Sequence, residues 1–392
     1  MTTDFSETLW TDEPTRRREF PVCAEKIFLA HAAVTALPRA VAAAEIAFAR
    51  GATTFAQSYE EILRELRLTR EASARLLGDG AHADEIALLG PTSLGLSLIA
   101  AGLDWQAGDE VVFYPDDYPA NVYPWTNLAE TRGVRPVALA PARAGEITPE
   151  IVAAALTPKT RLVALASASF LSGYRIDLDA IGALLHERGV LFCVDAIQTL
   201  GAFPTSVRHA DFLCADAHKW LLGPLCAGIV WVKKTHFARL RPALLGTNVR
   251  APDFVTQPDI VLPNGAWRYE PGVLNVGPLL GMRAALELFE RIGAARVTAR
   301  IAENVARLAD ALAALGLQFL GPTAGPNASG ILTAWHPQHD ARQLVKALEA
   351  RGIVASLRRD RAGKNYVRFS PHFYNTESEL DETVACVRAA LG

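Results

Sequence analysis

Short runs of apolar, often β-branched residues alternate along this chain with longer segments whose apolar residues follow helical spacing. Runs of the first kind cover residues 86–89, 110–114, 162–166, 190–194, 211–214 and 228–232. Helical segments such as residues 178–188 separate them. This alternation is typical of a mostly parallel sheet that helices cover on both faces. We therefore predict an α/β fold.

The pattern changes after Val232. Proline and glycine are frequent over residues 241–272, which predicts a long irregular connection with a domain boundary near it. Beyond the boundary, helical patterns cover residues 279–315 and 341–350, and strand patterns cover residues 330–334, 353–355 and 366–369. The sequence thus predicts a large domain over residues 36–275 and a smaller α/β domain over residues 276–392.

Composition restricts the partners of the chain. Its 392 residues carry a formal net charge of -3, so there is no basic surplus for nucleic acid. The five cysteines have no paired spacing, which is typical of reduced thiols and predicts a cytoplasmic location. Glycine and proline interrupt the most apolar stretch, residues 86–103, and the N-terminus lacks a secretory pattern, so we predict no membrane partner.

Two charged residues follow predicted strands at the edge where open α/β sheets bind ligands. Asp195 ends the run 190–194, and Lys219 follows the run 211–214, just before the apolar Trp220. A lysine can hold the aldehyde of pyridoxal 5′-phosphate as a Schiff base, and a carboxylate can keep its pyridine nitrogen protonated. Taken alone, Lys219 could be a surface lysine and Asp195 a helix N-cap. Their pairing favours the cofactor.

Further polar residues could bind other parts of such a ligand. Thr92 and Ser93 open a predicted helix, where hydroxyls and free backbone N–H groups suit a phosphate but also form an ordinary cap. Arg368 lies on the predicted strand 366–369, and its planar guanidinium could bind an α-carboxylate or form an interdomain salt bridge. No metal site is predicted.

Five motifs stand in one order along the chain. They are Leu29-Ala-His-Ala-Ala33, Pro119-Ala-Asn-Val-Tyr-Pro-Trp125, Val194-Asp-Ala-Ile-Gln198, Ala217-His-Lys-Trp-Leu-Leu-Gly-Pro224 and Arg368-Phe-Ser-Pro-His-Phe-Tyr-Asn-Thr376. In these motifs the chain resembles the class V aminotransferase family of pyridoxal phosphate enzymes, which includes cysteine desulfurases and isopenicillin N epimerase. The resemblance implies fold type I, with a mostly parallel sheet of the seven-stranded type in the large domain. It also implies that residues 1–35 pack with the small domain and that the protein is a homodimer.

The resemblance assigns roles to single residues around the cofactor. Lys219 is implied to carry it as an internal aldimine and to act as general base, and Asp195 to pair with the pyridine nitrogen. Gln198 would donate a hydrogen bond to the phenolate oxygen. Thr92 and Ser93 would bind the phosphate.

The resemblance also assigns roles to four more residues. Tyr118 falls where desulfurases carry a histidine that stacks on the cofactor, although it could instead be an aromatic side chain packed in a loop. His218 would contact the phosphate or the surroundings of the lysine, or act as a structural hydrogen bonder. Arg368 would bind the substrate carboxylate, and His31 is assigned to the substrate as well.

The chain also departs from the desulfurase pattern. The loop 356–365 contains no cysteine, so we expect that the protein is not a persulfide-type cysteine desulfurase. Asp216 stands where desulfurases have a phosphate-binding serine or threonine, and Val273 replaces a threonine that in many relatives reaches the phosphate of a neighbouring subunit. Phe170 replaces an asparagine beside the cofactor oxygen.

The expected function is that of a pyridoxal phosphate enzyme acting on a small α-amino acid through a quinonoid intermediate. Transamination and β-elimination of the C–S lyase type rank together, and an epimerase of the isopenicillin N type is the alternative. A non-catalytic binding or regulatory protein with the same fold is the alternative of another class. A nicotinamide-dependent dehydrogenase is disfavoured because no Gly-x-Gly-x-x-Gly motif follows the first strand.

Overall fold

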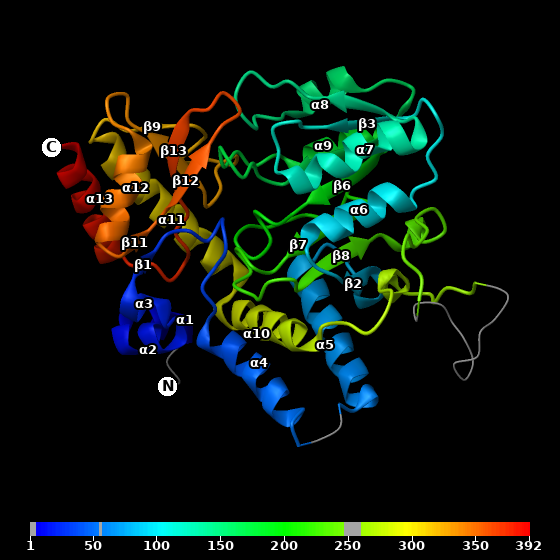
Figure 1. Cartoon of the computed structure of the whole chain (residues 1–392), viewed down its shortest axis with the longest axis horizontal. Helices are drawn as coiled ribbons and strands as arrows, with labels where there is room; N and C mark the ends of the chain where they lie inside the picture. The colour runs from blue at the N-terminus through cyan, green and yellow to red at the C-terminus, as the bar shows by residue number, and fades with distance from the viewer. Residues whose placement is uncertain (1–4, 55–56, 247–259) are drawn as a thin grey trace.

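The computed structural model describes residues 5–54, 57–246 and 260–392. In this part of the chain, a seven-stranded sheet with the order β2-β8-β7-β6-β5-β3-β4 forms the centre of a large lobe (Figure 1). Its strands are β2 (Ile86–Leu88), β3 (Glu110–Phe113), β4 (Arg135–Ala138), β5 (Thr160–Ala166), β6 (Leu191–Asp195), β7 (Phe212–Asp216) and β8 (Gly228–Val232). Only β8 runs antiparallel to its neighbours. The predicted α/β fold with a mostly parallel sheet is confirmed.

Strand burial follows the composition of each strand. The central strands β6 and β7 are buried along their whole length, as continuous apolar runs predict for a sheet covered on both faces. The edge strand β4 was not predicted, because it is short, partly exposed and contains Pro136. Proline is tolerated there because it has no backbone N–H to donate, and one side of an edge strand has no neighbouring strand to accept such a hydrogen bond.

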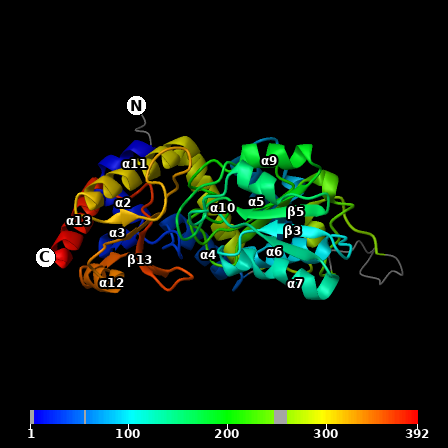
Figure 2. The same cartoon turned by 90° about the horizontal axis from the view of Figure 1, so that it is seen from above.

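Helices cover both faces of this sheet (Figure 2). Alternate strand residues point to opposite faces, so Val112 belongs to one apolar core while Val111 belongs to another. The helix α9 (Leu178–Glu187) packs into the first core, and α6 (Thr92–Gly102) and α7 (Tyr123–Arg132) pack into the second. The carboxyl ends of β6 and β7 are thereby left open to the small lobe.

The small lobe is built on a four-stranded sheet with the order β12-β13-β10-β9. Its strands are β9 (Gln318–Phe319), β10 (Leu332–Trp335), β12 (Ser356–Arg359) and β13 (Asn365–Phe369), and its helices are α11 (Ala294–Ala313), α12 (Ala341–Ala350) and α13 (Glu377–Leu391). The predicted helix over residues 279–315 is divided at Gly293, whose φ of 92° ends α10 (Val276–Ile292).

The N-terminal segment lies beside the small lobe (Figure 1). It consists of α1 (Phe5–Thr11), α2 (Glu13–Glu19), α3 (Val22–Glu25) and the short strand β1 (Ile27–Phe28), which pairs with β11 (Ile353–Val354). Arg16 anchors it through an ion pair with Glu379 at 2.9 Å. The domain boundaries near residues 35 and 275 remain predictions, since α10 packs closely against α4 (Arg39–Gly51) and α5 (Tyr59–Leu77).

Part of the predicted irregular connection, residues 247–259, lies outside the described residues. Its described end contains the short 3₁₀ helix η5 (Ala266–Tyr269). In the portion of the chain that the structure describes, no helix has both the length and the apolar character that a membrane crossing needs.

A buried ion pair fixes the end of that connection to the sheet. Arg70 Nη2 on α5 lies 2.7 Å from each carboxylate oxygen of Glu270, just after η5. Glu270 also accepts a hydrogen bond from the backbone N–H of Leu88 at 2.7 Å, and Arg70 donates to the carbonyl of Ile86 at 3.1 Å. Arg70 and Glu270 therefore bind the backbone of the edge strand β2 as well as each other.

Replacement of Arg70 by leucine is expected to lower the free energy of unfolding by about 3–5 kcal/mol, because it leaves a buried carboxylate without its cation. Urea denaturation measures this loss. Arg75→Leu is the matched control on the same helix, since its pair with Glu290 is solvent-exposed and should contribute less than about 1 kcal/mol. Equal losses in the two variants would contradict the prediction.

Candidate active site

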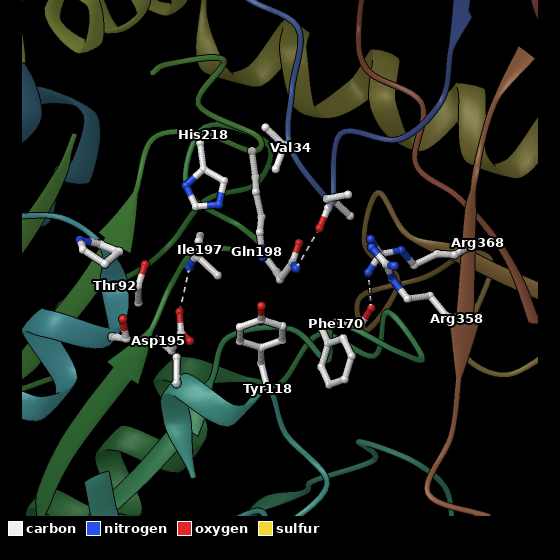
Figure 3. A pocket seen from close by; sticks show the side chains of 16 residues that line it. Val34, Thr92, Tyr118, Phe170, Asp195, Ile197, Gln198, His218, Arg358 and Arg368 are labelled. Atoms are coloured by element: carbon white, nitrogen blue, oxygen red, sulfur yellow. Dashed lines mark hydrogen bonds between the residues drawn. The ribbon is translucent and has the colours of Figure 1, made fainter. Parts of the chain in front are cut away.

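A cavity of about 460 Å³ lies between the carboxyl ends of the large-lobe strands and the small-lobe hairpin (Figure 3). Every residue that the sequence predicted for the site lines it except His31: Thr92, Ser93, Tyr118, Asp195, Gln198, His218, Lys219 and Arg368. All of them except Arg368 end or follow strands of the seven-stranded sheet, which brings these strand ends to one edge. Arg368 comes from β13 of the small lobe.

Lys219 lies in a tight turn that follows β7. Its carbonyl accepts a hydrogen bond from Leu222, whose φ of 56° is uncommon for a branched residue, and Gly223 donates to Ala217. A Cβ on Gly223 would lie 2.5 Å from the Ala217 Cβ, so the turn requires glycine. Only 7% of Lys219 is exposed, and burial lowers the pKa of its ammonium group to about 8. The amine is thus a usable nucleophile near neutral pH.

Asp195 ends β6 beside Lys219. It is 3% exposed, and its Oδ1 accepts a hydrogen bond from the backbone N–H of Ile197 at 3.0 Å. Burial raises the pKa of this carboxyl to about 6, while that hydrogen bond and the charge of Lys219 oppose the rise. A buried carboxylate of this kind suits a cationic partner such as a protonated pyridine nitrogen.

Gln198 is held in one amide orientation. Trp220 Nε1 donates to Gln198 Oε1 at 2.9 Å, and Gln198 Nε2 donates to the carbonyl of Ala32 at 3.3 Å. An indole N–H can only donate, so the oxygen of the amide must face Trp220. Nε2 keeps a second N–H, which is consistent with the predicted donor role.

The start of α6 meets the end of β7 on another side of the cavity. Thr92 is the first residue of the helix, and its Oγ1 accepts a hydrogen bond from the backbone N–H of Asp216 at 2.9 Å. Asp216 does not line the cavity, and its buried Oδ1 accepts a hydrogen bond from the backbone of Ala217 at 2.8 Å. A phosphate at the helix start would therefore not meet this carboxylate in the cavity lining. His218 Nδ1 lies 3.2 Å from the same Oδ1, without hydrogen-bond geometry.

Two aromatic rings form the side of the cavity toward the large lobe. Tyr118 and Phe170 meet edge to face with their centroids 5.5 Å apart. The Nζ of Lys219 lies 5.4 Å from the centre of the Tyr118 ring. Tyr118 is 51% exposed and lies between Asp195 and Phe170 in the view of Figure 3, where a flat cofactor ring can stack on it.

Arg368 is almost completely buried yet largely unpaired. Its Nη1 donates to the carbonyl of Phe170 at 2.6 Å, whereas Nε and Nη2 have no hydrogen-bond partner among the described residues. Burial, and next the charge of Arg358, lower its pKa well below the usual range. Arg368 forms no interdomain salt bridge among the described residues, which was the alternative role considered for it. Its unpaired nitrogens therefore suit the binding of an anionic ligand.

Sequence reasoning missed one residue that lines the cavity and one that lies close behind its lining. Arg358 lines the cavity from β12, in the segment that was considered only for its lack of cysteine. Asp117, next to Tyr118, accepts hydrogen bonds from Asn121 Nδ2 at 3.1 Å and from the backbone of Tyr118 at 2.7 Å. Burial and the charge of Asp195 raise the pKa of Asp117 to about 7. A predicted pairing of residues 356–359 with 365–369 would have revealed Arg358.

His31 lies outside the cavity. It is fully buried, with Nδ1 2.9 Å from the carbonyl of Ser370 and Nε2 2.6 Å from the hydroxyl of Tyr374. Burial lowers its pKa to about 4. Both ring nitrogens are therefore occupied within the protein, and the predicted substrate role of His31 finds no support in its position.

The residues of the cavity fit pyridoxal 5′-phosphate. A buried lysine and a buried carboxylate stand next to each other, a helix start offers donors for a phosphate, and an aromatic ring faces the space between them. The unpaired buried nitrogens of Arg368 add a place for an anion beside that space. This donor set suits an amino acid joined to a flat anionic cofactor.

Comparison with known proteins agrees with this assignment. The model of the family "Aminotransferase class-V" matches residues 27–383. A probable cysteine desulfurase of Methanothermobacter thermautotrophicus is 29% identical over 383 residues, which cover 93% of this chain and 94% of the relative. The apo structure of a cysteine desulfurase from Thermococcus onnurineus superposes with a TM-score of 0.88 at 23% identity and covers 96% of this chain and 97% of its own.

A third similarity bears on the sulfur chemistry. The cystine C–S lyase C-DES, solved in complex with its reaction product cysteine persulfide, has a TM-score of 0.86 at 22% identity, over 94% of this chain and 99% of its own. The expectation that the protein is not a persulfide-type cysteine desulfurase is contradicted by these relatives. The absence of cysteine from one loop was too weak a ground, because a persulfide can also form on a small molecule.

The family match extends over most of the chain and over both lobes. The structural neighbours confirm fold type I, and the strand order of the large lobe agrees with that prediction. The chain belongs to the aminotransferase class-V family of pyridoxal phosphate enzymes.

Proposed function

We propose that the protein is a pyridoxal phosphate-dependent C–S lyase, which cleaves the bond between Cβ and sulfur in a sulfur-containing α-amino acid. The observation that carries the proposal is that Lys219 shares one cavity with the buried carboxylate of Asp195 and with Arg368, whose Nε and Nη2 are unpaired among the described residues. Asp195 suits the pyridine nitrogen of the cofactor, and Arg368 suits the carboxylate of the substrate. The names of the relatives support the choice of a sulfur substrate.

In this proposal each residue has one task. Lys219 would hold the cofactor through Nζ and, once released, would take the proton from the substrate α-carbon. Bound pyridoxal phosphate supplies an electron sink for the charge left at that carbon. Asp195 would keep the pyridine nitrogen protonated, and Gln198 would donate its remaining N–H to the phenolate oxygen.

Arg368 would orient the substrate. Its free Nε and Nη2 form a planar pair of donors that matches the two oxygens of an α-carboxylate. Since the β12–β13 hairpin holds this guanidinium opposite the turn of Lys219, a substrate fixed by its carboxylate presents its α-carbon to the lysine.

We also propose a homodimer in the cytoplasm. A groove of the large lobe is lined by Tyr59, Leu63, Trp267 and Val273, all of them large apolar residues that are at least two-fifths exposed. Exposed apolar surface of this kind is typical of an interface. Val273 itself is 84% exposed and faces solvent in the single chain.

The products of the reaction test the proposal. The purified enzyme with pyridoxal phosphate should release sulfide or a thiol or persulfide from L-cysteine or L-cystine at least about 100-fold faster than free cofactor does. Sulfide, pyruvate, alanine and ammonia are measured together. Pyruvate with ammonia indicates β-elimination, and alanine indicates desulfuration. A keto acid that retains the sulfur, or inversion at the α-carbon without cleavage, would favour transamination or epimerisation instead.

Lys219→Ala is expected to abolish the absorption band of the lysine-bound cofactor and to reduce turnover by at least about 1000-fold, since both the covalent attachment and the general base are lost. Absorbance and circular dichroism report cofactor attachment and fold separately. Lys346→Ala, at an exposed position of α12, is the control and should retain both signals. An unchanged absorption band in Lys219→Ala would refute the assignment.

The pKa of Lys219 predicts how attachment depends on pH. Only the neutral amine attacks the aldehyde, and burial lowers the ammonium pKa to about 8. The amine fraction therefore increases as the pH rises through 8, so the rate of cofactor attachment to apoprotein should rise about tenfold between about pH 7 and pH 9 and then level off. Stopped-flow absorbance measures this rate. A rise that continues to the ordinary pKa of a lysine would contradict the lowered value.

A further inference from the structure

We propose that Arg358 binds a second anionic group at the far end of the substrate side chain, so that the enzyme prefers sulfur-containing α-amino acids with a distal carboxylate. This inference rests on the proposed function and specifies the substrate of that site.

The hairpin presents two arginines on one face. Ser356 of β12 pairs directly with Arg368 of β13, so these two side chains lie on the same side of the sheet. Arg358 follows Ser356 by two residues and therefore points to that side as well. Figure 3 shows the guanidinium groups of Arg358 and Arg368 next to each other at the cavity.

The charges around the two guanidinium groups do not balance. Asp195 is the only acidic residue among the described residues that line the cavity, whereas Lys219, Arg358 and Arg368 are basic. Asp195 is needed for the pyridine nitrogen, and one α-carboxylate satisfies Arg368. Lys219 would be joined to the cofactor, so Arg358 is the cation of this lining that is left without an anion. Neighbouring cations disfavour each other unless an anion lies between or beside them.

Arg358 has no acidic partner among the described residues. Its Nη1 donates to the carbonyl of the adjacent Leu357 at 3.0 Å, and no ion pair involves it. The other arginines of the hairpin are engaged away from the cavity. Arg359 donates to the carbonyl of Gly363 at 3.2 Å, and Arg361 forms an ion pair with Asp116 at 2.7 Å. Only Arg358 among these three is left to meet a ligand in the cavity.

The turn of the hairpin also contacts the large lobe. Arg361 Nη2 donates to the carbonyl of Pro115 at 2.6 Å, in addition to its ion pair with Asp116. These contacts attach the turn of the hairpin to the segment that leads to Tyr118. Arg358 lies beside Arg368 on the small-lobe side of the cavity, within reach of the side chain of a substrate that Arg368 holds by its α-carboxylate.

Two probes that differ in charge but hardly in shape test the proposal. S-carboxymethyl-L-cysteine carries a distal carboxylate, and S-carboxamidomethyl-L-cysteine carries a neutral amide in its place. Dissociation constants are measured with the holoenzyme from the change in cofactor absorbance, and thiol release is measured in parallel. The wild type should bind the carboxylate probe at least about tenfold more tightly.

Variants assign that preference to one residue. Arg358→Gln should weaken binding of the carboxylate probe by at least about tenfold and change binding of the amide probe by less than about twofold. Arg358→Lys, which keeps the charge, should restore part of the preference. Arg359→Gln is the matched control, because its side chain lies on the opposite face of the same strand and should change neither constant.

The outcomes separate this proposal from the proposed function. Equal binding of the two probes by the wild type, or equal weakening of both in Arg358→Gln, would overturn it. Binding is read from absorbance and needs no bond cleavage, so a charge preference without thiol release would support the role of Arg358 while contradicting the lyase. An unchanged cofactor band in each variant shows that it is folded and loaded.

Discussion

The electrostatic interaction between Asp195 and Lys219 is the constraint on which the site depends. Each is almost fully buried, and burial shifts the two pKa values toward each other, to about 6 for the carboxyl and about 8 for the ammonium group. Their mutual attraction limits both shifts. The interaction exists because β6 and β7 are parallel neighbours, with Asp195 paired to Cys214, so that both strands end at the same edge. A ligand with one cationic nitrogen and one aldehyde matches this pair of groups.

Most of the large lobe could be predicted from the chain, because fully buried parallel strands are continuous apolar runs. The candidate residues at the strand ends followed from the rule that ligands bind beyond carboxyl ends. The edge strand β4 and the strand β12 were missed, since both are short and carry charged side chains. Arg358 was missed with β12, because its direction depends on pairing with a strand that no local pattern reveals. His31 shows the opposite error, where a motif residue is buried among structural partners.

The contradicted expectation about sulfur chemistry has a similar cause. Cysteine desulfuration was excluded because ten residues, 356–365, contain no cysteine. Most of the chain nevertheless matches proteins named for that reaction. The segment is not a detached loop: its first part is β12, and its turn contacts the large lobe through Arg361. What the segment contributes to the cavity is a guanidinium group. The segment does lack cysteine, but this absence says little about which substrate the cavity binds.

The hairpin itself has a mechanical consequence. Arg358 and Arg368 lie on adjacent, hydrogen-bonded strands, so they move as one rigid unit with the small lobe. Any displacement of that lobe away from the sheet withdraws both guanidinium groups together. Release of the product would then be a single event in which both guanidinium groups leave it together, rather than two successive steps.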